Sequence, residues 1–485
     1  MIDRRNFIRT LAAGGAALAC SDRRVHAIER RRVSAPGPAS FRSAASQLNA
    51  TLQASDADVS LSGRSARLFT FNGRLPGPLL EARAGDEVTI RFDNALGEAT
   101  NLHFHGLHIP PTGTGDNIFL HIEPGTTFTY NFALPPDHAA GLFWYHPHLH
   151  GATARQLSRG LAGPFVIRGE IDTVPEVAAA NEQIMLLQDF ELDSRGNVIE
   201  PSVPERMHGR EGSIVTAGGA INPTIPIQQN GLLRLRLVNA SSSRFYRLQI
   251  DEHPLHLIGV DGSALGSART VDEVLFTPGQ RLDILIEGAR SQGSYRLLNL
   301  PYDRGTEMMG GMMGSRRQIA ATETLATIEY RGRAERSWTI PGSLPGTIAP
   351  LAPSELPPRT FQLGMGMMGG GMMRMGGGGM NFTINGRAFD ANRIDSAPRL
   401  GTIEDWIYVN STTMDHPMHL HTNPFQLVDE NGAAERAWRD VILVKAGAEA
   451  RFRVAFKDFA GKTVQHCHIL DHEDQGMMAT VEMQS

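Results

Sequence analysis

Hydrophobic and polar residues alternate along short runs that recur through the chain. Alternation with a period of two is typical of a strand with one buried face, and Gly, Pro and Asn separate the runs as turn residues do. Three of the runs end in an Asn that could start a turn, and they cover residues 87–94, 232–239 and 404–410. Few long helical periods lie between them. The pattern predicts an all-β chain made of repeated sandwich units.

A second set of signals repeats in the same order. A pair ending in Gly precedes an alternating strand in each unit, at residues 124–125, 278–279 and 446–447. A later glycine follows in each unit, and five residues beyond it stand, in turn, His146-Pro147-His148, Leu298-Asn299-Leu300 and His466-Cys467-His468. The same position therefore carries histidines in the first and third units and none in the second.

These repeats divide the chain into three expected β-sandwich units, at about residues 45–170, 171–331 and 332–485. Because only the outer units carry histidine pairs, we expect a metal site between them. The middle unit would act mainly as a spacer that holds the other two face to face.

The middle unit also contains a run that resembles a histidine motif of the third unit. Residues 253–258 (His-Pro-Leu-His-Leu-Ile) are similar to residues 416–421 (His-Pro-Met-His-Leu-His), with Ile258 where the last histidine would be. We therefore expect His253 and His256 to be packing residues rather than metal ligands.

The densest group of metal-binding side chains lies near the C-terminal end. On an extended segment successive side chains point to opposite faces, so His466 and His468 face one way and Cys467 the other. One strand can therefore serve two metal centres. A Cys with two His and a weak axial Met is the ligand set of a blue-copper electron-transfer site. Cys467, His472 and Met477 supply three of those four ligands.

The fourth ligand is expected from the segment at residues 416–421. In an extended segment His419 and His421 point to the same face, while His416 can reach the opposite face. Two further pairs lie nearer the N-terminus, and they are His103 with His105 and His146 with His148. The four clusters together offer ten His, one Cys and one Met, which is too many for one mononuclear site.

With these four motifs the chain resembles the multicopper oxidases, the family of the laccases and bacterial cuprous oxidases, over roughly residues 45 to 485. The resemblance implies three consecutive cupredoxin-like domains and four copper ions, one of type 1, one of type 2 and two of type 3. It makes His416, Cys467 and His472 the type 1 ligands, with Met477 axial. It makes His103 and His419 the type 2 ligands. The type 3 ligands would be His105, His146, His148, His421, His466 and His468.

The implied activity couples one-electron oxidation of a substrate to four-electron reduction of dioxygen to water. Cys467 is adjacent in the chain to His466 and His468, so electrons taken up at its sulfur would pass through the backbone to the type 3 ligands. Proton delivery needs acids near the dioxygen site. Glu473, beside His472, resembles the proton-relay position of the family, and Asp116 resembles its second acid.

The methionines bear on which substrate the protein oxidises. Of its 19 Met, four fall in residues 308–313 and seven in a Gly-rich insert at residues 365–380. Gly-rich sequence cannot pack them as the core of a helix or strand, and soft sulfur ligands select Cu(I). The inserts resemble those of cuprous oxidases, so we expect Cu(I) as first substrate and phenols as a second class. Met414 and Asp415, directly before His416, could form the docking point where the electron enters.

Three alternatives stay open. The first is a general phenol-oxidising laccase or a ferroxidase whose Met loops only obstruct bulky substrates. The second is a non-enzymatic copper-sequestering protein, and the third is a structural relative of the oxidases that has lost its copper. The complete ligand set argues against the last two.

The N-terminal residues predict export. Paired arginines precede a Phe at residues 4–7, and an uncharged run at residues 10–20 is too short to span a bilayer comfortably. This pattern indicates a twin-arginine signal peptide over residues 1–27, followed by a linker at 28–44. Lipid attachment at Cys20 is the alternative. We expect a periplasmic or otherwise exported protein, without a membrane span.

Charge and cysteine content fit that compartment. Without residues 1–27 the chain has 41 Lys and Arg against 49 Asp and Glu, a formal charge of −8, so there is no electrostatic case for nucleic acid. Cys467 would be its single cysteine. A lone thiol in an oxidising compartment needs a reason, and the flanking histidines indicate metal ligation. We expect a monomer.

Overall fold

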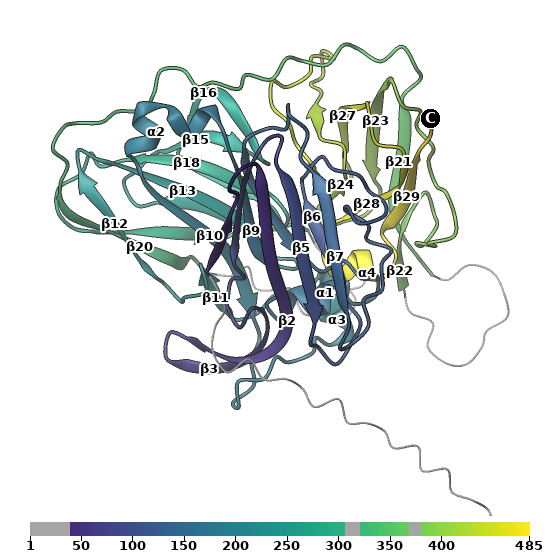
Figure 1. Ribbon diagram of the computed structural model, residues 1–485, viewed down its shortest axis with the longest axis horizontal. Coiled ribbons are helices and arrows are strands. Elements are labelled where there is room, and N and C mark those ends of the chain that lie inside the picture. Colours follow the sequence, from purple (N-terminus) through teal and green to yellow (C-terminus); the bar gives the residue numbers. More distant parts are fainter. Residues whose placement is uncertain (1–38, 306–320, 368–379) are drawn as a thin grey trace, which may run out of the picture.

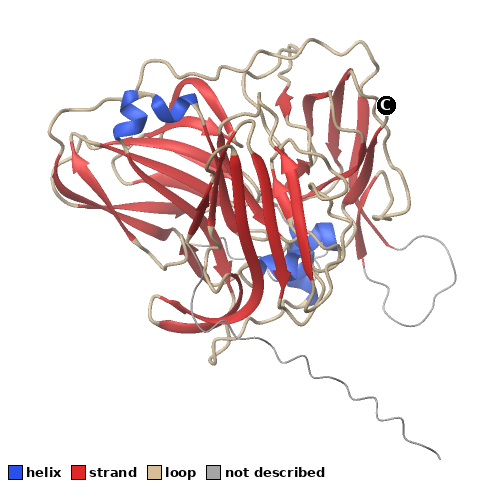
Figure 2. Ribbon diagram, in the orientation of Figure 1, coloured by secondary structure: helices blue, strands red, loops and turns tan. Residues whose placement is uncertain are grey.

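The computed structural model describes residues 39–305, 321–367 and 380–485. In this part of the chain strands dominate and form three sandwiches of two sheets each (Figures 1 and 2), which confirms the all-β, three-sandwich prediction. The predicted signal peptide, Cys20, the Met run at 308–313, most of the insert at 365–380 and most of the linker lie outside the described residues. None of the described helices has the length and apolar character to cross a membrane.

The first sandwich pairs a five-stranded sheet of order β1-β4-β9-β8-β6 with a four-stranded sheet of order β3-β2-β5-β7. Phe92, Phe104 and Tyr130 are among the buried side chains that fill its core. Its strands are β1 (Ser40–Arg42), β2 (Gln47–Leu61), β3 (Arg64–Phe71), β4 (Leu79–Arg83), β5 (Glu87–Asn94), β6 (His103–His105), β7 (Thr127–Ala133), β8 (Gly141–His146) and β9 (Gly163–Arg168). The short helix α1 (Thr153–Ser158) lies between β8 and β9.

The second sandwich pairs a six-stranded sheet of order β11-β10-β13-β18-β15-β16 with a five-stranded sheet of order β12-β20-β19-β14-β17. Its strands are β10 (Asn181–Phe190), β11 (Ile214–Ala217), β12 (Thr224–Gln229), β13 (Leu232–Asn239), β14 (Tyr246–Ile250), β15 (Leu255–Val260), β16 (Ser263–Val271), β17 (Glu273–Phe276), β18 (Arg281–Glu287), β19 (Ser294–Leu300) and β20 (Glu323–Arg333). Helix α2 (Pro175–Ala179) precedes β10 in the chain, and helix α3 (Val203–His208) lies between β10 and β11.

The third sandwich pairs a five-stranded sheet of order β22-β21-β23-β27-β25 with a four-stranded sheet of order β26-β24-β28-β29. Its strands are β21 (Arg359–Met367), β22 (Met380–Ile384), β23 (Thr402–Asn410), β24 (His416–Leu420), β25 (Phe425–Leu427), β26 (Val441–Val444), β27 (Glu449–Phe456), β28 (Gly461–Cys467) and β29 (Met478–Met483). Helix α4 (Leu470–Asp474) joins β28 to β29. The boundaries at 170/171 and 331/332 stay predictions.

The alternating runs occupy the same place in each sandwich. β5, β13 and β23 each pair in parallel with one strand and antiparallel with another. Each ends in an Asn whose side-chain oxygen accepts a hydrogen bond from the backbone two residues on, for Asn94, Asn239 and Asn410 at 3.0, 3.1 and 2.9 Å. The predicted turn-starting asparagines are therefore confirmed, and the structural repeat follows the sequence repeat.

One predicted correspondence in the middle unit is wrong. β19, which carries Leu298-Asn299-Leu300, pairs with β14 just as β28 pairs with β24 and β8 with β6, so it is the histidine-free copy that the sequence predicted. However, β15 pairs with β18 in the other sheet. The counterpart of residues 416–421 is therefore β14 rather than residues 253–258. Strand pairing determines which segments of two sandwiches correspond, and a local likeness of residue types does not.

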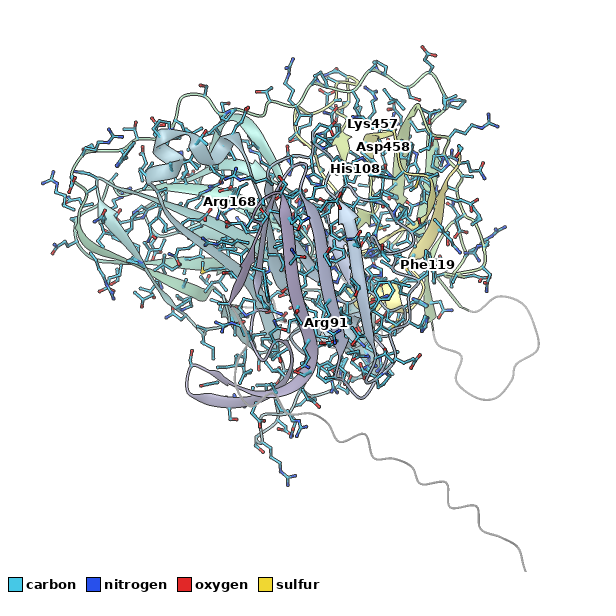
Figure 3. The ribbon with its side chains drawn as sticks, viewed as in Figure 1. Arg91, His108, Phe119, Arg168, Lys457 and Asp458 are labelled. Carbon is cyan, nitrogen blue, oxygen red and sulfur yellow. The ribbon has the colours of Figure 1, made fainter. Side chains whose placement is uncertain are left out.

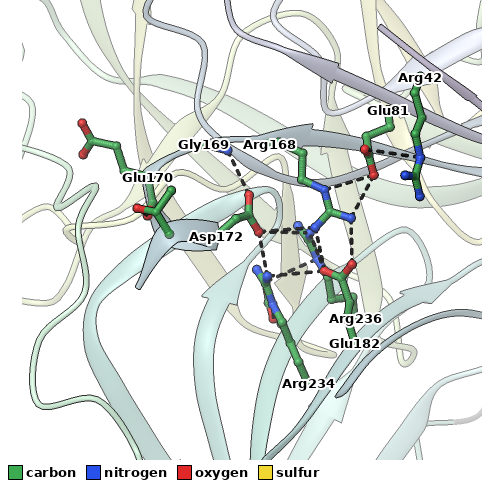
Figure 4. Close-up of polar contacts among 11 residues, drawn as sticks. Arg42, Glu81, Arg168, Gly169, Glu170, Asp172, Glu182, Arg234 and Arg236 are labelled. Atoms are coloured by element: carbon green, nitrogen blue, oxygen red, sulfur yellow. Dashed lines mark hydrogen bonds and ion pairs between the residues drawn. The ribbon is translucent and has the colours of Figure 1, made fainter. Parts of the chain in front are cut away.

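A partly buried ion-pair network joins the first two sandwiches (Figure 4). Arg168 at the end of β9 donates to Glu182 on β10 at 2.7 and 2.8 Å and to Glu81 on β4 at 2.9 Å. Beneath it, Arg234 on β13 makes a two-bond pair with Asp283 on β18 at 2.6 and 2.9 Å. Removing one partner of such a pair leaves an uncompensated charge, so the network holds the two sandwiches in one arrangement.

Candidate metal centres

The first centre is built from His416 on β24, Cys467 on β28 and His472 on α4. The Cys467 Sγ lies 3.4 Å from the Nδ1 of His416 and 3.8 Å from the Nδ1 of His472. The two Nδ1 atoms lie 3.4 Å apart. All three side chains are fully buried. Three ligand atoms therefore converge on one point from three separate elements.

The second nitrogen of each imidazole in this centre is already occupied. His416 Nε2 bonds with the Thr412 hydroxyl at 2.8 Å, and His472 Nε2 donates to the Met207 carbonyl at 3.0 Å. Each Nδ1 is therefore the atom presented to a metal. Met477 is buried beside them, and its carbonyl accepts a hydrogen bond from the Cys467 backbone at 3.0 Å.

Burial favours the metal-binding form of the imidazoles and disfavours the free thiolate. Desolvation lowers the pKa of His416 to about 3, so the ring stays neutral. Desolvation also raises the pKa of the Cys467 thiol. A thiolate in such a site needs a bound cation to compensate it. Two neutral imidazoles, one thiolate and a nearby thioether fit copper.

The second centre gathers eight buried histidines from the first and third sandwiches. Their nitrogens approach one another across the interface, with His103 Nε2 3.3 Å from His419 Nε2 and His148 Nε2 3.1 Å from His466 Nε2. His421 Nε2 lies 3.0 Å from the same His466 nitrogen. The remaining members are His105, His146 and His468, and all eight are buried. The expected site between the outer units is where these side chains meet.

Several imidazole nitrogens in this cluster lack any hydrogen-bond partner. Buried polar atoms without a partner are rare because each costs its full desolvation free energy. Desolvation also lowers the pKa of these rings, as at His103 and His468. The rings are therefore neutral, and their free nitrogen lone pairs can bind a cation. The cluster therefore fits several metal ions of copper's ligand preference. The unpartnered atoms are His105 Nδ1, His146 Nε2, His148 Nδ1, His421 Nδ1 and both ring nitrogens of His468.

The two halves of the cluster are related by approximate two-fold symmetry. In the first sandwich His103 lies opposite His146, and in the third His419 lies opposite His466. The two pairs are thus the same positions of one strand pair. His466 and His468 belong to this cluster while Cys467 belongs to the first centre, which is the alternation expected along an extended strand.

Both predicted acids contact the cluster. The Asp116 carboxylate lies 2.8 Å from His103 Nδ1 and accepts from the Phe104 backbone at 2.8 Å, and desolvation raises its pKa to about 8. The Glu473 carboxylate lies 3.0 Å from His466 Nδ1 and 3.6 Å from His148 Nδ1. The two acids thus stand on different sides of the cluster, each against a ring nitrogen.

Met414 and Asp415 lie beside the first centre but are covered. Met414 is 1 % exposed, and its backbone forms a bridge with Gly305. The Asp415 carboxylate accepts hydrogen bonds from the Ala446 backbone at 2.8 Å, from Lys445 at 3.2 Å and from the Tyr302 hydroxyl. A docking point at these residues therefore lies below the surface and would be reached through their neighbours.

Three neighbours of the centres were missed by sequence reasoning. Phe382 on β22 stacks on His472 with ring centroids 3.8 Å apart. Asp440 contacts His105 Nε2 at 3.0 Å, and Arg281 of the middle sandwich binds Asp440. No spacing rule marked them, although Arg281 follows the repeated Pro-Gly pair. His108, which lies three residues after His105, pairs with Asp458 at 3.0 Å (Figure 3).

Comparison with known proteins identifies the architecture. Three family models, each described as multicopper oxidase, match residues 53–171, 186–332 and 357–485. The multicopper oxidase mco of Staphylococcus haemolyticus is 28% identical, over 85% of this chain and 83% of that protein. The cell division protein FtsP of Escherichia coli is also 28% identical, over 80% of this chain and 79% of its own length.

Solved structures agree with these matches. A Campylobacter jejuni multicopper oxidase, described as a metallo-oxidase, is 31% identical with a TM-score of 0.77, covering 92% of this chain and 96% of that one. The laccase-like enzyme CueO of Ochrobactrum sp., with oxidase activity towards lignin model compounds and lignosulfonate, is 26% identical with a TM-score of 0.76, covering 92% of this chain and 100% of that one.

Proposed function

This chain belongs to the multicopper oxidase family, and from that premise we propose that it is an exported oxidase whose first substrate is Cu(I) and whose second is phenols. Family membership makes it a copper-dependent oxidoreductase with dioxygen as acceptor and with type 1, type 2 and type 3 copper centres. The choice of reducing substrate and the export are the parts proposed.

We assign the ligands by position and by the fit of the donor atoms. His416, Cys467 and His472 would hold the type 1 copper, because their ligand atoms converge in a buried site, and the neighbouring Met477 would be a fourth ligand. His103 and His419 would hold the type 2 copper. The type 3 pair would be held by His105, His146, His148, His421, His466 and His468. Copper bound at these ligands supplies one-electron exchange at the first centre and reduction of dioxygen at the second.

The chain connects the two centres by covalent bonds. Cys467 is the residue between His466 and His468 on β28, so only a few backbone bonds separate its sulfur from ligands of the second centre. The strand is held in place because His466 pairs with His419 and with Met478, and the His468 backbone donates to the Pro417 carbonyl at 2.6 Å. We propose this segment as the electron path.

Glu473 and Asp116 are proposed to move protons toward the second centre. Each is buried and each lies against a histidine of the cluster, at His466 and His103 respectively. A carboxyl group in hydrogen-bond reach of the reacting region is the geometric requirement for general acid catalysis.

The observation that supports Cu(I) as substrate is the position of the described residues next to the two Met-rich runs. Gly305, the last described residue before the run at 308–313, forms a bridge with Met414, two residues from His416. β22, which follows the second run, carries Phe382 stacked on His472. Both runs therefore join the fold beside ligands of the first centre. We propose that Met414 and Asp415 are the inner end of the entry route.

The relatives support both substrate classes. The Campylobacter jejuni protein is described as a metallo-oxidase, which favours a metal ion as electron donor. The Ochrobactrum enzyme is described as active towards lignin model compounds, which favours phenols. The Met-rich runs favour the metal ion for this chain, because thioethers are ligands for Cu(I) and offer nothing specific to a phenol.

The test replaces sulfur while keeping the length of the insert. Met368, Met372, Met373 and Met375 are changed together to Leu, which keeps an apolar side chain of similar size. We expect the rate of Cu(I) oxidation, followed by dioxygen consumption, to fall while phenol oxidation stays unchanged. Unchanged Cu(I) oxidation with or without faster phenol oxidation would favour the general laccase. Cu(I) binding without dioxygen consumption by the natural chain would favour the copper-sequestering protein.

Export is tested at the paired arginines. Changing Arg4 and Arg5 together to Lys keeps the charge but removes the twin-arginine signal. We expect the protein to accumulate in the cytoplasm instead of the periplasm, as measured by cell fractionation. Changing Cys20 to Ala separates the lipid alternative, because only a lipidated protein would leave the membrane fraction on that change.

A further inference from the structure

The middle sandwich, which contributes none of the proposed copper ligands, reaches the histidine cluster at one turn. Gly279, which precedes β18, has φ +85°, and a Cβ built there would lie 2.7 Å from the ring of His468. Only glycine fits such a contact without displacing the ring. This turn therefore packs directly against a proposed type 3 ligand, and the residue two positions on, Arg281, points into the same junction.

Arg281 joins all three sandwiches. Its Nη1 donates to Asp440 Oδ1 of the third sandwich at 2.6 Å, and its Nη2 donates to the other oxygen of the same carboxylate. Its Nε donates to the Leu142 carbonyl of β8 in the first sandwich at 3.2 Å. The side chain is 1 % exposed. A buried bidentate arginine of this kind fixes both the position and the orientation of the carboxylate it holds.

Asp440 in turn contacts a ligand from each outer sandwich. Its Oδ1 lies 3.0 Å from His105 Nε2, and its backbone carbonyl lies 2.7 Å from His419 Nδ1. A hydrogen bond at His105 Nε2 leaves Nδ1 as the free ligand atom, and that Nδ1 has no other partner. Because both oxygens of the carboxylate are held by Arg281, Asp440 acts on these rings by orienting them rather than as a ligand.

The arrangement has a counterpart that lacks the arginine. Asp116 contacts His103 at 2.8 Å and His421 at 3.5 Å, and these rings are the two-fold equivalents of His419 and His105. In the described structure the ion-pair partners of Asp116 are these histidines, whereas Asp440 has Arg281 as well. Among their ion-pair partners, the two carboxylates therefore differ in the guanidinium that the middle sandwich supplies to Asp440.

We propose that Arg281 is a positioning residue for the second copper centre. It holds the Asp440 carboxylate, and Asp440 sets the orientation of His105 and the position of His419. The middle sandwich is then part of the copper site and not only a spacer. Partners that orient metal-binding histidines change metal affinity by about 10- to 100-fold when they are removed. This inference rests on the ligand assignment proposed above.

The test measures copper and its spectra in the full-length chain. Arg281→Met removes the guanidinium, and Arg281→Lys keeps the charge but cannot form the two-bond pair. We expect Arg281→Met to lose type 2 and type 3 copper, with about a 10- to 100-fold weaker affinity by copper titration. The electron paramagnetic resonance signal of the type 2 copper would change, while the visible thiolate–copper absorption of the first centre stays. The copper affinity of Arg281→Lys would lie between that of the natural chain and that of Arg281→Met.

A matched control is available in the same sandwich. Arg234 is equally buried and binds Asp283 through two bonds, but it contacts neither metal centre. Arg234→Met is expected to lower stability and to keep full copper content and unchanged spectra. A loss of copper in Arg234→Met equal to that in Arg281→Met would mean that general destabilisation causes the effect and would overturn the inference.

Three further outcomes would contradict either the positioning role or the ligand assignment. If Arg281→Met keeps natural copper content and an unchanged type 2 signal, the positioning role is wrong. If Arg281→Met does not fold, Asp440→Asn replaces it, since the amide keeps the shape but loses the charge that Arg281 holds, and unchanged spectra in that variant would equally overturn the role. A natural chain without type 2 and type 3 signals would instead refute the ligand assignment.

Discussion

The Nε2 atoms of His103 and His419 lie 3.3 Å apart, although 316 positions separate the two residues in the chain. They occupy equivalent places in the first and third sandwiches, because each lies opposite a second histidine of its own strand pair. Two neutral imidazoles whose Nε2 atoms face each other in a buried site stabilise each other little. A cation between the outer sandwiches gives both a partner, so the metal site and the sandwich interface should depend on each other.

Copper removal should therefore lower the stability of the whole fold. A ligand that binds only the native state stabilises it by about 2.7 kcal/mol when its free concentration is 100 times its Kd. We expect the chelated protein to unfold at lower temperature and to recover with added Cu(II), as measured by calorimetry. His103→Ala should recover less than the natural chain, because it lacks one ligand of the interface. Equal recovery in both would contradict a link between copper and the interface.

Cys467→Ser should separate the two centres. The hydroxyl nearly matches the thiol in size but does not provide a soft ligand, so the visible absorption of the first centre should vanish. The eight histidines are unchanged, so the type 2 signal should remain, and oxidation of every substrate should fall to background because the electron path is cut. Copper content, visible absorption and dioxygen consumption check this. Substantial turnover in Cys467→Ser would show that electrons enter the second centre by another route.

Glu473→Gln should slow turnover without removing copper. The amide preserves the buried shape beside His466 and His148 but cannot deliver a proton. General acid catalysis contributes roughly 10² to 10⁴ in rate, so kcat should fall by about 10²-fold while the blue absorption stays. Asp116→Asn is the parallel variant on the other side of the cluster. Rapid-mixing measurements should show normal reduction of the first centre and slow reoxidation by dioxygen. Slow reduction instead would place Glu473 on the electron path.

The strands were largely predictable, and the site only in part. Residues 87–94 and 232–239 form strands with those bounds because alternation and a turn-starting Asn are local signals. The sequence likeness of residues 253–258 to residues 416–421 predicted the wrong counterpart. The strands that correspond in the two sandwiches are those that pair with β19 and with β28. Arg281 and Asp440 could not be predicted, since 159 positions separate them and their contact exists only in the packed interface. The histidines and the cysteine of both centres could be proposed from the sequence because they occur in short motifs with regular spacing, although the motifs lie far apart in the chain.

Gly106→Ala offers a sharp test of that packed interface. Gly106 follows His105 with φ +85°, and a Cβ there would lie 2.4 Å from Arg281 Nη2 and 2.7 Å from Asp440 Oδ2. Gly85 has φ +83° with no atom within 4 Å of its Cβ position, so it is a matched control. The left-handed conformation costs an alanine about 1–2 kcal/mol at either site. Gly106→Ala should show this cost plus the clash with the ion pair.

The two variants should therefore differ in stability and in copper. By calorimetry, Gly85→Ala should lower the free energy of unfolding by about 1–2 kcal/mol and keep all copper signals. Gly106→Ala should lose more stability and should also lose type 2 and type 3 copper, because the displaced Arg281 and Asp440 no longer hold His105 and His419. Adding Arg281→Met to Gly106→Ala relieves the clash with the guanidinium, but it restores neither the contact with Asp440 nor the orientation of the histidines, so stability should partly return while the copper signals do not. Recovery of both would show that the clash alone disturbs the site.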